Sequence, residues 1–201
     1  RGLGDVYKRQ AVTTSMTLTG DDEDNYTLTQ PEGLTANITA KALTVTDAVA
    51  VDKVYDGTTT ATIIGATLNG AIGDDDVALD ALVGAFATKD AGEGIAVSAA
   101  ITLTGDDADN YTLTQPTGLA ANITAKALTV SGALADSKTY DGTTAATISG
   151  AVLTGAVAGD DVALGALAGT FASSDVGDGI AVTPALTLTG DDADNYSLTQ
   201  P

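Results

Sequence analysis

The string TGDDADNYTLTQP occupies residues 104–116, and it decides how the whole chain is organised. Nearly the same residues recur as TGDDEDNYTLTQP from Thr19 and as TGDDADNYSLTQP from Thr189. The Asn-Tyr pairs of the three strings lie 85 residues apart each time, and the Tyr-Asp-Gly triplets at 55–57 and 140–142 keep the same spacing. Such a period exceeds the roughly 20–50 residues of a solenoid repeat and is long enough for a small domain. The repeat therefore predicts a string of duplicated modules.

The period divides the chain into a leader followed by modules or parts of modules. Residues 41–116 align with residues 126–201 without a gap. We therefore predict the C-terminal part of a module at 11–40, a complete module at 41–125, and at 126–201 a module that lacks its last strand. Residues 1–10 break the pattern and hold every arginine in the chain. We interpret them as a non-native leader and leave them out of the fold.

Short alternating runs predict β-strands. Thr, Val, Ile and Tyr alternate with small or polar residues between Gly, Asp, Asn and Pro, which is the pattern of half-buried antiparallel strands. In the complete module the expected strands cover residues 42–46, 51–55, 60–64, 77–82, 84–88, 95–104 and 111–115, with 119–124 leading out. Strands of this kind, with frequent turn signals, are typical of an immunoglobulin-like β-sandwich. The sequence thus predicts an all-β chain of tandem, small, antiparallel sandwich modules.

One stretch leaves a different fold open. Residues 76–83 begin at a run of Asp residues suited to cap a helix, and apolar residues follow at helical spacing. A short helix here would make a β-grasp-like module. The second copy, however, carries Gly165, Gly169 and Thr170 in the corresponding stretch, and each glycine weakens a helix by roughly 1 kcal/mol. We therefore expect a pair of strands, with the β-grasp as the alternative.

Composition argues against most catalytic mechanisms and two classes of partner. The 201 residues include no His and no Cys, so the usual general base, the thiolate nucleophile and the common zinc ligands are missing. We expect no enzyme, no catalytic residues and no cofactor. A formal net charge of −19 repels nucleic-acid phosphates and anionic lipid, and no apolar run is long enough to span a membrane. The sequence therefore predicts no nucleic-acid binding and no membrane insertion.

The repeated acidic string has two interpretations. Hard oxygen ligands of the kind that Ca²⁺ prefers would stiffen the joints between modules; they are Asp106, Asp107, Asp109 and Asn110. The EF-hand pattern fails, because a count from Asp107 finds no Gly at the sixth position and no Glu at the twelfth. In immunoglobulin-like domains a corner with an Asp precedes a Tyr whose hydroxyl bonds back to the corner backbone, and Tyr111 has that place. We favour the corner, predict no metal site, and leave Ca²⁺ binding at these residues and their repeat equivalents open.

The second signature is the Tyr-Asp-Gly-Thr-Thr string at 55–59 and at 140–144. Asp-Gly is a turn dipeptide, because Gly tolerates positive φ and Asp bonds locally. We interpret each Tyr as an aromatic anchor that ties the turn to the core, in preference to a polar contact pair of Tyr55 with Asp56. Glycosylation stays open at the Asn-x-Ser/Thr sites, which are Asn25, Asn37, Asn110, Asn122 and Asn195.

Together these strings resemble a known family. Tyr-Asp-Gly-Thr-Thr, Gly-Asp-Asp-Val-Ala-Leu, a Gly-x-Phe-Ala strand, Gly-x-Gly-Ile-Ala-Val and the acidic string follow one another at fixed offsets. The succession resembles the YDG module of large bacterial surface and secreted proteins, as in repeats of filamentous-haemagglutinin-type adhesins, alongside related MBG-type modules. The resemblance implies an extracellular structural or adhesive role and brings no catalytic residues.

These observations predict a structural spacer or stalk segment of a large, repetitive bacterial adhesin that is secreted or held at the cell surface. The junction ANITAKALTV contains no Pro, Gly or Ser cluster, so strand runs into strand, which favours a stiff rod. The expected partners are neighbouring modules of the same chain, with host or cell-surface ligands bound by other regions. The alternative is a module with its own carbohydrate-binding or host-protein-binding surface and calcium-stiffened joints.

Overall fold

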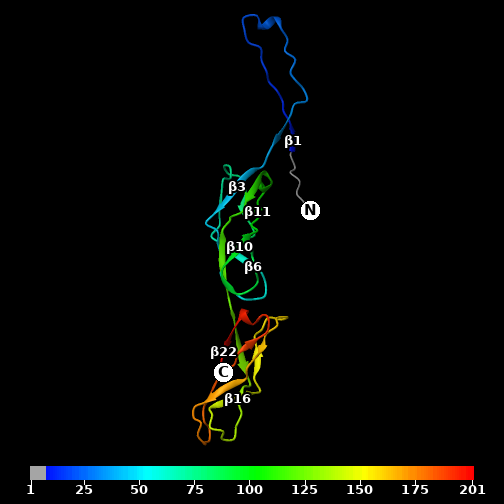
Figure 1. Cartoon of the computed structure of the whole chain (residues 1–201). Coiled ribbons are helices and arrows are strands. Elements are labelled where there is room, and N and C mark those ends of the chain that lie inside the picture. The colour runs from blue at the N-terminus through cyan, green and yellow to red at the C-terminus, as the bar shows by residue number, and fades with distance from the viewer. Residues whose placement is uncertain (1–7) are drawn as a thin grey trace.

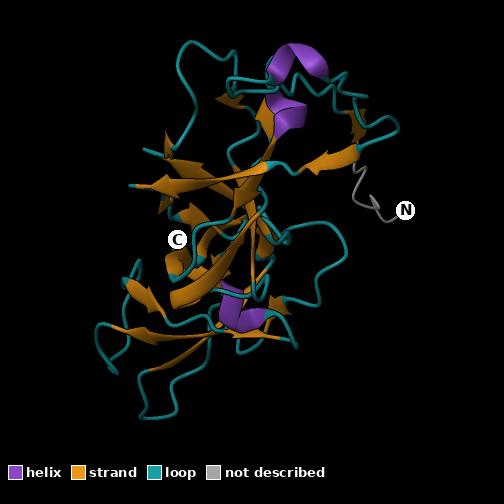
Figure 2. Cartoon of the chain, turned by 90° about the horizontal axis from the view of Figure 1, so that it is seen from above, coloured by secondary structure: helices purple, strands orange, loops and turns teal. Residues whose placement is uncertain are grey.

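The computed structural model describes residues 8–201, which form strands, loops and short 3₁₀ turns (Figures 1 and 2). In these residues two β modules follow one another end to end along one long axis, and an N-terminal segment extends beyond the first module (Figure 1). Most of the predicted leader, residues 1–7, lies outside the described residues. The segment that follows contains β1 (Lys8–Ala11), which pairs antiparallel with β2 (Thr35–Ile38). No helix in the described part of the chain is long and apolar enough to cross a membrane.

The first module contains three sheets. The bounds of its strands are β3 Lys41–Thr46, β4 Val49–Ala50, β5 Lys53–Val54, β6 Thr60–Ile64, β7 Thr67–Asn69, β8 Ala78–Leu79, β9 Val83–Phe86, β10 Gly92–Ala99, β11 Leu103–Thr104, β12 Tyr111–Thr114 and β13 Leu119–Thr124. The largest sheet has the order β4-β6-β9-β10-β13-β5, and the smaller ones have the orders β12-β3-β7 and β11-β8. β13 therefore closes the module that begins at β3, and the chain leaves this strand directly into the next module.

The second module repeats this plan with a shorter main sheet. Its strands are β14 Lys126–Ser131, β15 Leu134–Ala135, β16 Ala145–Ser149, β17 Val152–Thr154, β18 Ala163–Leu164, β19 Ala168–Phe171, β20 Val182–Pro184, β21 Leu188–Thr189 and β22 Tyr196–Thr199. The sheets have the orders β15-β16-β19-β20, β17-β14-β22 and β18-β21. Within the described residues the second module has no counterpart of β13 or of β5, so its main sheet stops at β20.

The prediction of an all-β chain is confirmed, and the helix of the β-grasp alternative is absent from the described residues. β8 occupies part of the stretch where that helix was considered, and it pairs with β11. Most strand pairs are antiparallel, as predicted, but β12 runs parallel to β3 and β13 runs parallel to β5. The predicted strand at 51–55 is replaced by β4 and β5 on either side of Asp52.

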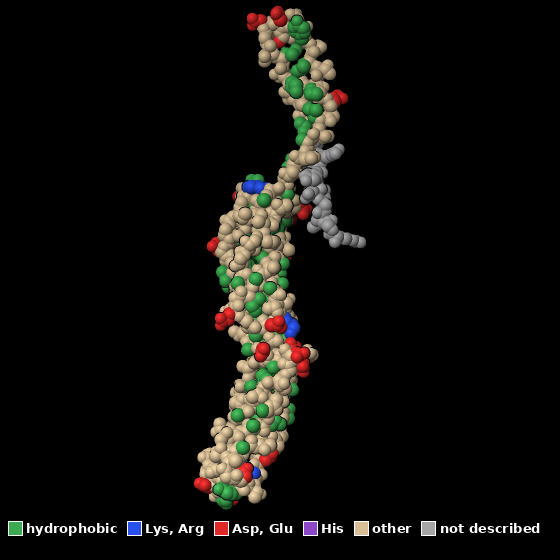
Figure 3. All heavy atoms as spheres, in the orientation of Figure 1, with side chains coloured by type: hydrophobic (Ala, Val, Ile, Leu, Met, Phe, Trp, Pro, Cys, Tyr) green, Lys and Arg blue, Asp and Glu red, His purple; other side chains and the backbone are tan. Residues whose placement is uncertain are grey.

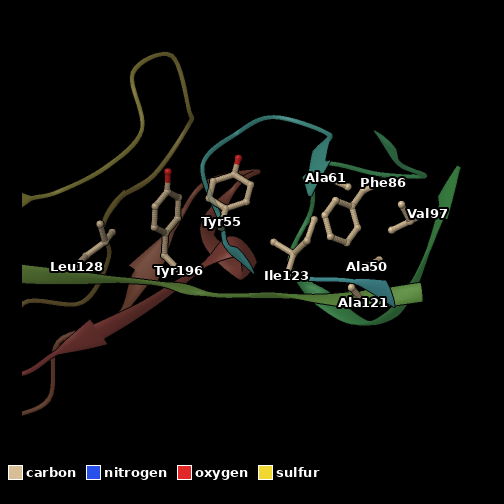
Figure 4. Packing of buried hydrophobic residues seen from close by; sticks show 9 residues of the cluster. All are labelled: Ala50, Tyr55, Ala61, Phe86, Val97, Ala121, Ile123, Leu128 and Tyr196. Atoms are coloured by element: carbon tan, nitrogen blue, oxygen red, sulfur yellow. The ribbon is translucent and has the colours of Figure 1, made fainter. Parts of the chain in front are cut away.

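The core follows from period-two alternation. In β6 the side chains of Ala61 and Ile63 are buried while their neighbours are exposed, and β13 buries Ala121 and Ile123 in the same way. One cluster of buried side chains continues from the first module to Leu128 and Tyr196 of the second (Figure 4). The hydrophobic core therefore runs through the boundary between the modules.

Candidate functional site at the joint between the modules

In each of the two modules the acidic string forms a 3₁₀ turn, and the tyrosine that follows it contacts a neighbouring loop. The turn η2 (Ala108–Asn110) leads into Tyr111 at the start of β12. The Tyr111 hydroxyl donates to Asp75 Oδ2 and accepts from the backbone N–H of Ile72 at 3.0 Å. The predicted corner is therefore present, but the partner of its hydroxyl lies in the loop between β7 and β8 and not on the corner's own backbone. The buried ring reaches across the end of the module and ties two loops together.

The aspartates next to these tyrosines cap backbone groups. Asp107 Oδ2 accepts from the backbone N–H of Asp76 at 2.9 Å, and Asp76 Oδ2 accepts from the backbone N–H of Asp106 at 3.1 Å. The second module repeats both contacts with Asp192 and Asp161. In the described residues no group of three or more acidic side chains is arranged to hold a metal ion. These carboxylates thus have a structural role in joining two loops, and Ca²⁺ binding at the string stays an open alternative.

A lysine organises the turn of each Tyr-Asp-Gly string. Lys53 Nζ donates to Asp56 Oδ1 at 2.8 Å and to the backbone oxygen of Thr58 at 2.6 Å, and it lies 5.5 Å from the centroid of the Phe86 ring. Lys138 makes the same contacts in the second module. The hydrogen bond from Lys53 lowers the pKa of Asp56 to about 2. The turn is thereby fixed so that the preceding tyrosine projects from the end of the module.

Tyr55 projects from this turn into the second module. Its side chain is only 1% exposed, and its hydroxyl donates to Asp160 Oδ2 at 2.8 Å. The same oxygen accepts the hydroxyl of Tyr196, which in turn accepts from the backbone N–H of Val157 at 2.9 Å. The two rings meet edge to face with their centroids 5.3 Å apart (Figure 4). One carboxylate of the second module therefore holds a tyrosine from each side of the boundary.

Further contacts surround this pair of tyrosines. Lys89 Nζ donates to the Tyr55 hydroxyl at 3.2 Å and to Asp192 Oδ1 at 3.1 Å. The backbone N–H of Ala91 donates to Asn195 Oδ1 at 2.8 Å. A lysine and several acidic side chains accordingly lie side by side where the modules meet (Figure 3). We call this set, together with Tyr55, Asp160 and Tyr196, the joint.

The electrostatics of the joint keep its side chains in the protonation states that its hydrogen bonds and ion pair require. Burial, followed by the hydrogen bond to Asp160, raises the pKa of Tyr196 to about 12. Burial also raises the pKa of Tyr55, so both hydroxyls remain protonated donors at neutral pH. The hydrogen bond to Asp192 raises the pKa of Lys89, and the backbone N–H of Asp161 lowers the pKa of Asp192. The Lys89–Asp192 pair therefore stays fully charged near neutral pH.

Both halves of the joint come from strings that recur at the 85-residue period, and comparison with known families agrees with this repetition. A family profile described as the YDG domain matches residues 39–118 and again residues 124–201. The chain belongs to the YDG domain family. The resemblance drawn from the sequence is thus confirmed at the level of the family, in two tandem copies. No curated protein and no solved structure matches the chain.

The two YDG modules give equivalent residues different surroundings. Tyr55, predicted to anchor a turn to the core, is buried in the core cluster at the joint, whereas its counterpart Tyr140 is 63% exposed. The Asn-x-Ser site at Asn195 is buried in the joint, at 5% exposure, although Asn110 in the equivalent position is exposed. Sequence reasoning missed Lys89 because the other module has Ser174 at that position, so the repeat gives no signal for a lysine.

Proposed function

We propose that these YDG modules form a spacer segment in the stalk of a large, repetitive bacterial adhesin of the filamentous-haemagglutinin type, secreted or held at the cell surface, and that they carry no catalytic activity. The joint is the observation that carries this proposal. A spacer must keep its two ends a set distance apart, so the orientation of each module relative to the next has to be fixed. Here aromatic, ionic and backbone contacts at one boundary join the two modules.

The covalent connection supports the same role. β13 ends at Thr124 and β14 begins at Lys126, so a single residue separates a strand of one module from a strand of the next. Unlike a flexible Gly/Ser linker, this connection leaves little freedom for bending. A strand of about nine residues extends roughly 30 Å at 3.3 Å per residue, so each added module would lengthen the stalk by a distance of that order.

The finer description of each module as an immunoglobulin-like sandwich is part of this proposal. Alternating burial along β6 and β13, and the Tyr corner at β12, support it. The parallel pairings of β12 with β3 and of β13 with β5 distinguish the module from a purely antiparallel sandwich.

Stiffness at the joint tests the proposal directly. The chain has no cysteine, so Thr62→Cys and Thr147→Cys place one spin label on an exposed strand position of each module. Pulsed electron paramagnetic resonance should give a narrow distance distribution, which Tyr55→Ala broadens. Tyr140→Ala is the matched control, because it makes the same change at an exposed tyrosine and should leave the distribution narrow. A broad distribution in the chain with both tyrosines intact would refute the stiff spacer.

A further inference from the structure

The first and last segments of the first module run side by side through its whole length. Residues 41–55 contain β3, β4 and β5, and residues 111–124 contain β12 and β13. β12 pairs parallel with β3, and β13 pairs parallel with β5. In both ladders the partners are 70 residues apart, as Lys41 is from Tyr111. The two segments therefore keep one register from one end of the module to the other.

Further hydrogen bonds join the two segments outside the ladders. The Asp52 carboxylate accepts from the backbone N–H of Asn122 at 2.7 Å and from the side-chain Nδ2 of Asn122 at 3.1 Å. Thr124 Oγ1 donates to the backbone oxygen of Lys53 at 3.2 Å. The backbone N–H of Tyr55 donates to the oxygen of Thr124 at 2.9 Å. The last residues of both segments are thus joined as firmly as the first.

Buried side chains fix the register of this pair of segments. Leu43 of β3 is 0% exposed and Ile123 of β13 is 2% exposed, so each segment has a side chain enclosed in the core. A slip of one residue would turn these side chains to the opposite face of the sheet. The two segments can therefore move past one another only when several hydrogen bonds break together with this packing.

The chain enters the first module at one end of this pair and leaves it at the other. β2 leads into β3 at the start of the first segment, and β13 leads through Ala125 alone into β14. The N-terminal segment and the second module lie at opposite ends of the first module (Figure 1). A pull along the long axis therefore draws the two parallel segments in opposite directions along their own length. All the hydrogen bonds between them then share the load, whereas a pull at one shared end breaks them in turn.

We propose that the YDG module bears tension, and that residues 41–55 and 111–124 form a mechanical clamp that is loaded in shear when the stalk is pulled along its axis. The proposal deepens the spacer role and rests on it for the source of the tension. A spacer keeps its two ends apart, and the clamp keeps the module folded while force acts on those ends.

The second module receives the load in the same geometry. Its first strand, β14, pairs parallel with β22, and the partners are again 70 residues apart, as Lys126 is from Tyr196. Because only Ala125 separates β13 from β14, force that leaves the clamp of the first module enters directly at the start of this second parallel ladder. No flexible segment between the two modules extends before the ladders are loaded.

Pulling the full chain in two directions with optical tweezers tests the clamp. The chain has no cysteine, so DNA handles attached at Ala40→Cys and Ala125→Cys, both exposed positions, load the first module along its axis. Handles at Ala40→Cys and Asp109→Cys, also exposed, pull both segments from one end and peel the ladder open. At one loading rate the axial pull should need about twice the force or more, because the evenly spaced bonds of a parallel ladder share the load. Equal forces, or a larger force for peeling, would overturn the proposal.

A side-chain variant locates the clamp within the module. Asp52→Ala removes both hydrogen bonds to Asn122 and should lower the unfolding force of the axial pull, but not that of the peeling pull, which starts at the other end of the segments. Asp90→Ala is the matched control, because its carboxylate accepts from Thr88 Oγ1 at 2.7 Å outside both segments, and it should leave the axial force unchanged. Equal axial forces for the two variants, or an equal loss from Asp52→Ala in both directions, would refute the clamp.

The pulling experiment and the spin-label experiment fail independently. Both pairs of handles load the first module alone, whereas the spin labels report the orientation of one module on the other. A narrow distance distribution with equal pulling forces would leave the spacer proposal standing and refute the clamp. A broad distribution with a high axial force would refute the stiff spacer and support the clamp.

Discussion

Removing one hydroxyl from the joint should destabilise the protein measurably. Tyr55→Phe keeps the buried ring and its edge-to-face contact with Tyr196, and deletes the O–H that donates to Asp160 at 2.8 Å and accepts from Lys89 at 3.2 Å. Asp160 keeps Tyr196 as a donor and Lys89 keeps Asp192, so neither charge loses all its partners. The hydroxyl loses two hydrogen bonds to charged groups, one of them to a partly exposed lysine, and we expect the free energy of unfolding to fall by about 2 kcal/mol.

Tyr140→Phe supplies the control for this measurement. It removes the same hydroxyl from the equivalent position, where the side chain is 63% exposed, and should leave the free energy of unfolding unchanged. Urea unfolding of the full chain, followed by circular dichroism, gives both values. If the two variants lost the same stability, or Tyr55→Phe lost none, the joint would not be coupling the modules and our account of it would be wrong.

Three further predictions concern other parts of the molecule. Gly105→Ala should lower the free energy of unfolding by about 3 kcal/mol or more, because φ is +115° and a Cβ would lie 2.2 Å from the oxygen of Asp76. Gly73→Ala is the control, because it has open space around it and should lower the same free energy by only about 1 kcal/mol. Urea titrations measure both values. Asp56 has a lowered pKa, so its stabilising effect is present above its ordinary pKa and is lost as the pH falls towards about 2. Thermal melts of Lys53→Met at falling pH should therefore lose less stability than those of the unmodified chain. Lys89→Ser, which introduces the residue found at the equivalent position 174, should change the urea unfolding midpoint only slightly, because the ion pair with Asp192 is partly exposed and screened by solvent.

The strands could be predicted from sequence where apolar and polar residues alternate over enough positions to be recognised. β6 and β13 were predicted within a residue, because Ala61, Ile63 and their counterparts in β13 alternate with outward residues. β7 was missed, since three residues are too few to show a period. The strand predicted at 51–55 is interrupted because the Asp52 carboxylate accepts the backbone N–H of Asn122 at 2.7 Å. Alternation also says nothing about strand direction, so the parallel pairings could not be predicted.

The joint could be predicted only in part, because the repeat locates the boundary between the modules but does not show which residues meet across it. The tyrosines of both signatures were singled out, yet each was assigned to its own module. Asp160 lies in the Gly-Asp-Asp-Val-Ala-Leu string, but nothing in that string marks it as the acceptor for two tyrosines. Its role emerges only when two modules meet and its carboxylate accepts Tyr55 and Tyr196 together. Repeated motifs in a tandem protein are therefore candidates for contacts between copies as well as within them.

The two signatures are complementary at such a boundary. The Tyr-Asp-Gly string provides a tyrosine at one end of a module, and the acidic string, with the preceding loop, provides an aspartate and a second tyrosine at the other end. Where no second YDG module adjoins, these groups lack their partners across the boundary: Tyr140 is exposed, and Asp75 accepts from only one tyrosine in the described structure. Because the connecting segment holds successive modules at a high effective concentration, hydrogen bonds of modest strength are enough to hold each module against its neighbour.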